Sequence, residues 1–174
     1  ISYDSRDNPF DPSRGIFAGI SLKAASGLLF SETDFLKFIL HGSVYRRPIR
    51  FVTAALSLKS GVAEGLRDTR ELPLVERFFL GGRNTMRGFD QDMVGPAGIL
   101  GTPVGGNAYL LGNFELRFRI ANNWRLVGFL DADVGQSIVG PPATLGLKIL
   151  QRSTDELGEA PDALYFIGST SPAN

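Results

Sequence analysis

The side chains of this sequence whose types and spacing could do chemistry are three acids, Glu115, Asp131 and Asp133, together with Arg87 and His41. Three carboxylates on one polar face could hold an oxygen-preferring metal ion, and two acids could hydrolyse a glycosidic bond. An arginine nearby disfavours the metal, and no cleft with aromatic platforms is evident for a sugar. The single histidine, His41, has no nucleophile placed to pair with it. We therefore predict neither a metal site nor an enzyme.

Arg87 lies in the most distinctive segment of the chain, a loop over residues 71–106 between two strand-like segments. Roughly thirty-five residues is far more than a hairpin needs, so the loop is either functional or disordered, and its composition is too specific for disorder. Glycines let such a loop turn tightly or approach another surface closely. Taken alone, Arg87 would be a solvated loop arginine. The loop residues predicted to matter are Gly81, Gly82, Met86, Arg87, Gly88 and Phe89.

Composition narrows the class of protein. The chain has 174 residues, enough for one domain over 1–174. A net charge of zero gives no basic surface for nucleic acid, and the absence of cysteine removes disulfides and thiolate metal sites. No Walker loop or G-x-G-x-x-G motif is present, so no cofactor is predicted. No signal peptide is recognisable at Ile1, and we expect a mature chain or an excerpt of a longer one.

Alternation of apolar and polar residues with a period of two recurs along the chain, which is the pattern of half-buried β-strands. One such segment runs from Leu110 to Ile120 and places Glu115 on its polar face. Another begins at Trp124 and places Asp131 on its polar face. About eight strand candidates result, over residues 1–6, 16–24, 36–45, 51–59, 108–120, 124–133, 145–150 and 163–167.

The connections between these segments differ in length. Short turns are expected at Asn8-Pro9, Arg47-Pro48 and Asn122-Asn123, and long connections over residues 25–34, 60–107 and 151–162. Short turns at one rim and long loops at the other are typical of an outer-membrane barrel. A soluble sandwich would show the same alternation and would bury its apolar faces between two sheets.

Two aromatic residues, Trp124 and Tyr45, lie near strand ends, where a membrane barrel places its interfacial girdle. No run of eighteen apolar residues is present, so a transmembrane helix is excluded. The polar strand faces carry charged residues, which would line a lumen in a barrel and face water in a sandwich. Pattern alone favours the barrel and leaves the sandwich open.

Four separated segments resemble one protein family in their order and spacing. They are I-S-Y-D-S-R-D-N-P-F-D-P-S-R-G at 1–15, E-R-F-F-L-G-G-R-N-T-M-R-G-F-D-Q-D-M-V-G at 76–95, G-G-N-A-Y-L-L-G-N-F-E-L-R-F at 105–118 and F-L-D at 129–131. Up to Gly135 the chain is similar to the outer-membrane β-barrel assembly superfamily, the bacterial surface antigen family of BamA, TamA and the organellar import barrels. Beyond Gly135 the resemblance ends.

The resemblance implies an all-β fold, an antiparallel transmembrane β-barrel of sixteen strands, of which this chain would be the C-terminal half. POTRA domains would precede the barrel. In the family, the loop that corresponds to residues 71–106 folds back into the lumen, and the arginine of its R-G-F/Y motif pairs with acids on the strands that follow. That arginine is Arg87 in this sequence.

The same resemblance assigns the acids. The family's F-x-D-x-G strand motif falls on Phe129 and Asp131, and the other inward acid falls on Glu115. The alternation agrees, because it places both acids on polar strand faces, and a guanidinium can bind two carboxylates through its fork of donors. Asp133 departs from the family, since it stands where the motif has glycine, and we count it with Glu115 and Asp131 among the lumen acids expected to pair with Arg87. An extra acid there would either strengthen the field at Arg87 or mark a bulged strand.

The function implied is insertion, assembly or translocation of polypeptides in the outer membrane of a Gram-negative bacterium or an organelle, without covalent chemistry. The partners implied are the lipid bilayer, unfolded outer-membrane protein clients, upstream POTRA domains and accessory lipoproteins. One alternative is a barrel that anchors or exports an attached enzyme such as a patatin-like lipase. The other is a free-standing structural barrel of eight strands, whose narrow lumen would hardly hold the loop over 71–106.

Overall fold

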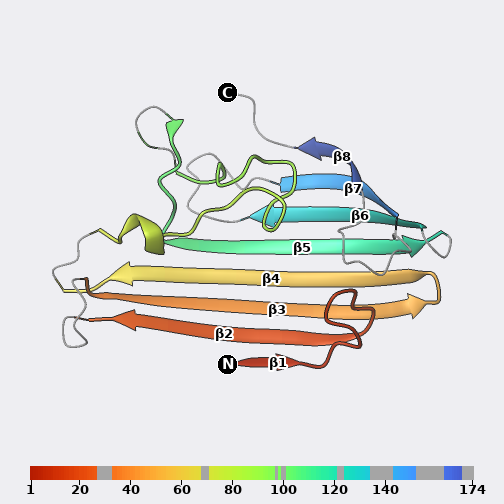
Figure 1. Cartoon of the computed structure of the whole chain (residues 1–174), viewed down its shortest axis with the longest axis horizontal. Coiled ribbons are helices and arrows are strands. Elements are labelled where there is room, and N and C mark those ends of the chain that lie inside the picture. Colours follow the sequence, from red (N-terminus) through yellow and green to blue (C-terminus); the bar gives the residue numbers. More distant parts are fainter. Residues whose placement is uncertain are drawn as a thin grey trace.

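The computed structural model describes residues 1–26, 33–67, 71–96, 98, 101–120, 124–133, 143–151 and 163–169, the last two ranges as backbone only. Its eight strands form one antiparallel sheet in chain order (Figure 1). The pairs between described strands include none that joins β8 to β1, so the sheet is open. The strands are β1 (Ser2–Asp4), β2 (Gly15–Ala25), β3 (Phe35–Ile49), β4 (Val52–Gly65), β5 (Ala108–Arg119), β6 (Trp124–Asp133), β7 (Ala143–Gln151) and β8 (Ala163–Ser169).

The predicted all-β antiparallel fold is confirmed, and each strand candidate coincides with an observed strand. The turn expected at Arg47-Pro48 lies slightly later, because β3 runs to Ile49 and β4 begins at Val52. Proline is tolerated in β3 because the register is interrupted between Arg46 and Ile49, where no regular ladder bond is lost. In the described part of the chain, no helix has the length and hydropathy to cross a bilayer.

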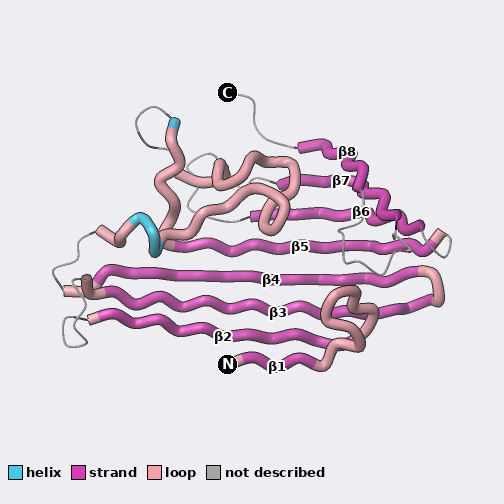
Figure 2. The backbone as a smooth tube through the Cα atoms, in the orientation of Figure 1, coloured by secondary structure: helices cyan, strands magenta, loops and turns pink. Residues whose placement is uncertain are grey.

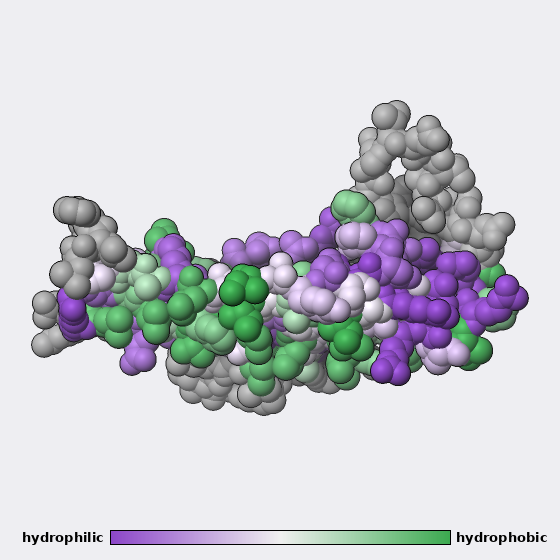
Figure 3. Space-filling model, turned by 90° about the horizontal axis from the view of Figure 1, so that it is seen from below, coloured by the Kyte–Doolittle hydropathy of each residue, from purple (hydrophilic) through white to green (hydrophobic). Residues whose placement is uncertain are grey.

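One face of the sheet is apolar and exposed, as expected of strands that meet lipid. The register aligns a single row of apolar side chains across five strands, each between 38% and 58% exposed. Figure 3 shows hydrophobic side chains gathered over the middle of the molecule and hydrophilic ones at the right end of the view. The aligned row is Ile16, Val44, Leu56, Phe114 and Leu130.

The opposite face carries the polar residues. Ser43, Asn113 and Asp131 lie in one row of the register across β3 to β6. Tyr45 lies two residues from Ser43 on this same face, with the Arg117 guanidinium 5.8 Å from its ring centroid. The expectation of Tyr45 in an interfacial girdle was therefore wrong, since its position in the alternation directs it to the inner wall.

The shortest and the longest connection between strands lie at opposite ends of the sheet. Residues 50–51 join β3 to β4, whereas residues 66–107 join β4 to β5 and include a short 3-10 helix, η2 (Leu74–Glu76). Figure 2 shows this long connection drawn over the upper strands of the sheet. Its hydrogen bonds to Asn113 and Asp131 place it against the inner faces of β5 and β6.

The two faces of β2 make a direct test. Ile20 is 50% exposed on the outer face, and Ser21 follows it on the inner face. In the full-length protein folded into phospholipid vesicles, Ile20→Arg should lower the free energy of unfolding by about 2–4 kcal/mol, because a lipid-facing guanidinium loses hydration. The control Ser21→Arg should cost less than about 1 kcal/mol. Denaturant titration measures both, and equal losses would contradict the assignment of faces.

Candidate functional site

The centre of the long connection has a backbone shape that depends on glycine. Gly81, Gly82 and Gly88 have φ angles of +113°, +82° and +96°, a region that L side chains rarely adopt. A Cβ at Gly81 would lie 2.3 Å from the carbonyl oxygen of Asp90. The N–H of Gly82 donates to the carbonyl of Phe89 at 3.0 Å, which closes the segment that presents Arg87.

Apolar residues on both sides of Arg87 in the sequence pack the loop against the inner face of the sheet. Met86 has no exposed surface, 0%, and contacts an apolar cluster that the loop shares with β5. Burial of one such side chain stabilises by about 1.5–3 kcal/mol. The cluster comprises Leu80, Met86, Val94 and Leu111, with Phe89 and Tyr109 packed against it.

Arg87 places its guanidinium between two carboxylates of the inner wall. Its Nε and Nη2 donate to the two oxygens of Asp131 at 2.7 and 2.6 Å, and its Nη1 donates to Glu115 Oε1 at 2.6 Å. The backbone N–H of Arg87 also donates to Asp131, at 3.2 Å. One arginine therefore joins the loop to β5 and β6 through charge-assisted bonds, including a bidentate pair.

The ion pair of Arg87 with Asp131 is largely buried. The side chain of Asp131 is 0% exposed and that of Arg87 is 13% exposed. The guanidinium carbon lies 3.8 Å from the ring centroid of Phe129, a stacking contact. Asn113 Nδ2 donates to Asp131 at 3.0 Å and satisfies a further lone pair. Because a buried charge without its partner costs several kcal/mol, the acid and the arginine each require the other.

The electrostatics of the site keep the arginine charged. Burial alone would lower the pKa of Arg87, but the hydrogen bonds to Asp131 and the charge of Glu115 raise that pKa above its ordinary value. Glu115 also accepts from Arg117 Nε at 2.9 Å. Since the guanidinium exchanges no proton at neutral pH, Arg87 acts through its fixed charge and hydrogen bonds and not as a general acid or base.

Asp133, the third predicted acid, lies outside this set of hydrogen bonds. It is buried on the inner face of β6, 2% exposed, opposite Leu111. The guanidinium of Arg87 donates to Asp131 and Glu115 instead. The register of β5 with β6 is continuous as far as Asp133, so the suggestion of a bulged strand at this position was wrong.

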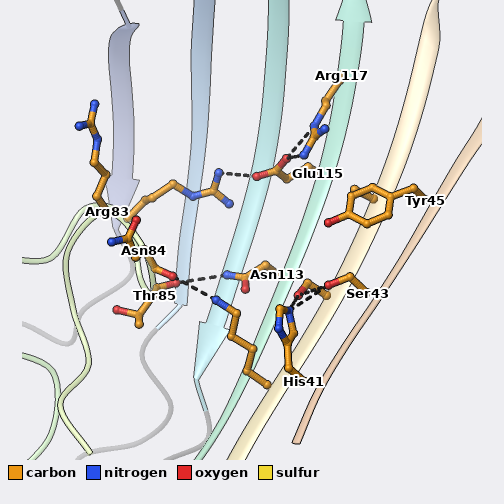
Figure 4. Close-up of a pocket in the computed structure, with 13 residues that line it drawn as sticks. His41, Ser43, Tyr45, Arg83, Asn84, Thr85, Asn113, Glu115 and Arg117 are labelled. Atoms are coloured by element: carbon orange, nitrogen blue, oxygen red, sulfur yellow. Dashed lines mark hydrogen bonds and ion pairs between the residues drawn. The ribbon is translucent and has the colours of Figure 1, made fainter. Parts of the chain in front are cut away.

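Other wall residues at the site were not selected from the sequence. A cavity of about 310 Å³ lies between loop and wall, and Figure 4 shows loop and wall side chains facing each other across it. Asn113 donates to the carbonyl of Thr85, and Lys59 Nζ to that of Asn84, each at 3.3 Å. The only sequence signal for Asn113 and Lys59 was their place on polar strand faces, which many residues share.

A second anchor holds the start of the loop. Glu76, the last residue of η2, accepts a hydrogen bond from Lys23 of β2, and this bond lowers the pKa of Glu76. Lys37 of β3 donates to the Glu76 carbonyl at 2.8 Å and lies 3.5 Å from its carboxylate. The loop is therefore tied to β2 and β3 as well as to β5 and β6.

His41 lies on the wall among hydroxyl groups. Ser43 Oγ donates to Ser57 Oγ at 2.9 Å, and His41 Nε2 is 3.1 Å from the first hydroxyl and 3.3 Å from the second. The imidazole also meets the ring of Phe17 at 4.9 Å between centroids. These contacts fit the expected role of a sheet residue. The described side chains contain no cluster of three or more acids, histidines or cysteines that could hold a metal ion.

Comparison with known proteins identifies the family of the chain. Residues 1–137 match the family described as the Omp85 superfamily domain, and the chain belongs to this superfamily of outer-membrane β-barrel proteins. The predicted family and outer-membrane location are confirmed. A structure of BamA from Haemophilus ducreyi lacking POTRA domains 1–3 matches with a TM-score of 0.83 and 18% identity, and covers 99% of this chain and 38% of that one. At such low identity this likeness shows the fold alone.

Curated relatives match most of the chain. It is 32% identical over 118 residues to a SAM50-like protein of Schizosaccharomyces pombe, which covers 66% of this chain and 24% of the relative. It is 30% identical over 113 residues to the sorting and assembly machinery component 50 homolog of Bos taurus, with shares of 65% and 24%. The chain therefore spans about a quarter of the length of these relatives.

A second family description, the P-loop of mRNA cleavage and polyadenylation factor CLP1, matches residues 117–174. That segment contains no G-x-x-x-x-G-K-[ST] sequence. A P-loop also joins a strand to a helix, whereas the described residues of this segment form antiparallel strands. We assign no nucleotide site to it.

Gly61 of β4 allows the loop to dock. A Cβ there would lie 2.4 Å from Tyr109 and 2.7 Å from Phe78, whose rings meet at 4.8 Å. Gly61→Ala should therefore displace the loop, destabilise the full-length protein by about 1–3 kcal/mol and speed tryptic cleavage at Arg83. Gly42→Ala is the control, since a Cβ there meets nothing within 4 Å. Equal protease resistance of both variants would disprove this docking.

Proposed function

We propose that this chain forms the C-terminal half of an outer-membrane barrel that inserts, assembles or translocates polypeptides, with the loop over 71–106 braced inside the lumen. Two comparisons support the proposal: one relative is named for a sorting and assembly machinery, and a matching structure is that of BamA. The open sheet, with β1 and β8 at its two edges, also supports half of a larger barrel.

The observation that carries the proposal is the contact of Arg87 with two strands at once. Arg87 is 44 positions from Asp131 in the sequence and 28 positions from Glu115, and it binds both. Because the guanidinium is shared, movement of β5 relative to β6, or of the loop relative to either, breaks a desolvated charge pair. The brace therefore stiffens this part of the wall without any covalent chemistry.

Stiffness of the barrel wall matters because insertion of a client strand requires an unpaired strand edge that keeps its position and register. An unpaired strand edge offers backbone N–H and C=O groups that pair with an incoming strand. In the proposed mechanism a client strand pairs with such an edge of the complete barrel while the lipid-facing rows keep the barrel in the membrane. The loop supports the inner wall and prevents the sheet from collapsing or slipping in register when the seam opens.

The partners follow from the same proposal. The apolar rows of the outer face meet the lipid bilayer, and unfolded outer-membrane proteins are the clients. Upstream POTRA domains and accessory lipoproteins are the remaining proposed partners of the barrel. Neither an attached lipase, which would carry a G-x-S-x-G motif outside this segment, nor a free-standing barrel is favoured by a specific observation, since the described strands show no closure of β8 on β1.

Replacement of Arg87 tests the brace. In the full-length protein, Arg87→Ala leaves Asp131 buried without its partner and should destabilise the docked loop by about 3–5 kcal/mol. Arg87→Lys keeps the charge but loses the fork and should have an intermediate effect. The measurements are tryptic cleavage of the loop in membranes and the rate of client assembly in proteoliposomes. Unchanged protease resistance together with unchanged assembly in Arg87→Ala would refute the proposal.

Two further variants make the result specific. Arg83 belongs to the same loop and lines the cavity, and no hydrogen bond or ion pair of its side chain is found among the described residues. Arg83→Ala should therefore leave client assembly unchanged, and assembly is its readout because the change also removes a tryptic site of the loop. Arg87→Gln combined with Asp131→Asn removes both charges together. This pair should recover part of the protease resistance lost in Arg87→Ala, because no buried charge is left alone.

A further inference from the structure

The turn between β1 and β2, residues 5–14, has a shape set by its own hydrogen bonds. Asp7 Oδ1 accepts from the backbone N–H of Ser13 at 2.8 Å and of Arg14 at 3.1 Å, and the Ser13 hydroxyl donates to Oδ2. The Ser13 hydroxyl and these N–H groups hold the pKa of Asp7 well below its usual range. The turn is therefore a fixed structure at neutral pH, with Pro12 and Ser13 buried.

This turn contacts strands that are not its neighbours. Asp11 Oδ2 lies 2.5 Å from Arg125 Nη1 on β6, and Asp11 Oδ1 lies 3.8 Å from Arg117 Nη1 on β5. The same Nη1 of Arg117 donates to the carbonyl of Pro12 at 3.3 Å. Since β3 and β4 separate β2 from β5, the turn must fold across the inner face, and Figure 1 shows it drawn back over the sheet.

Arg117 connects this turn to the loop brace. Its Nε and Nη2 lie 2.9 and 2.8 Å from Glu115 Oε2 (Figure 4). The other oxygen, Glu115 Oε1, accepts a hydrogen bond from Arg87 at 2.6 Å. Glu115 thus divides its two oxygens between an arginine held by the turn and an arginine held by the loop. The three side chains are between 13% and 22% exposed, so their charges interact more strongly than those of a surface pair.

We propose that Asp11 and Pro12 are positioning groups for the brace: the turn holds Arg117, Arg117 orients Glu115, and Glu115 receives Arg87. The turn at one end of the lumen and the loop that enters it are thereby coupled. Such coupling is reciprocal, so displacement of the turn loosens the loop, and release of the loop loosens the turn. The inference builds on the proposed brace but holds whether or not the barrel assembles clients.

A double-mutant cycle on the full-length protein in phospholipid vesicles tests this coupling, with amide hydrogen exchange of loop residues 80–90 as the readout. Asp11→Asn keeps the size of the side chain and removes its charge, and should speed loop exchange about fivefold. In a Glu115→Gln background the same change should add less than about twofold, because the connection is already cut. Equal effects of Asp11→Asn in both backgrounds, or no effect in either, would overturn the inference.

The controls separate coupling from general damage. Asp4→Asn removes another acid of the same hairpin, whose partner Arg6 lies 2.6 Å away within the hairpin, and should leave loop exchange unchanged. A loop response to Asp4→Asn as large as that to Asp11→Asn would also overturn the inference. Protection of the β3 and β4 amides verifies folding in each variant. Client assembly is measured in parallel. If assembly is unchanged in variants whose loop is loosened, the proposed function is contradicted. The hydrogen-exchange cycle alone decides whether the turn and the loop are coupled.

Discussion

The rest of the structure depends on one charged side chain held away from water. The guanidinium of Arg87 is mostly buried, and it stays there only because Asp131 and Glu115 supply negative charge at hydrogen-bonding distance. A buried cation of this kind sets conditions on its surroundings. The loop must turn sharply enough to present it, the acids must face inward from adjacent strands, and the stacked ring of Phe129 must lie beneath it.

The register of the sheet meets those conditions. Glu115 lies opposite Phe129, and Asn113 lies opposite Asp131, so the two acids are diagonal neighbours on β5 and β6. A slip of one residue would turn both carboxylates toward lipid. The desolvated charges therefore favour the same register as the apolar rows, because the wrong register would place ions in hydrocarbon and apolar rings in the lumen. Specificity of the fold and position of the loop have the same physical source.

Much of this could be predicted before the structure, and the limits have physical causes. Strand positions followed from a period of two, because a strand with one lipid-facing side must alternate. The residues of the loop motif and the acids Glu115 and Asp131 were identified by their resemblance to a family. Tyr45 was misplaced because its position near a strand end was weighed and its place in the alternation, on the same face as His41 and Ser43, was not. Glu76 was missed because its partners Lys23 and Lys37 lie on strands far away in the chain.

By itself the sequence determined the type of element, the two faces of each strand and the glycines of the loop, since these depend on neighbouring residues and local backbone energies. Only the tertiary structure decided which charges meet. Ion pairs such as Asp11 with Arg125 join the turn between β1 and β2 to a strand that is not its neighbour, and they form only when the turn folds over the sheet. In the sequence, every charged residue on an inward strand face shows the same alternation. A hydrogen bond depends on distances that are set only when the strands have paired in register and the loop has docked.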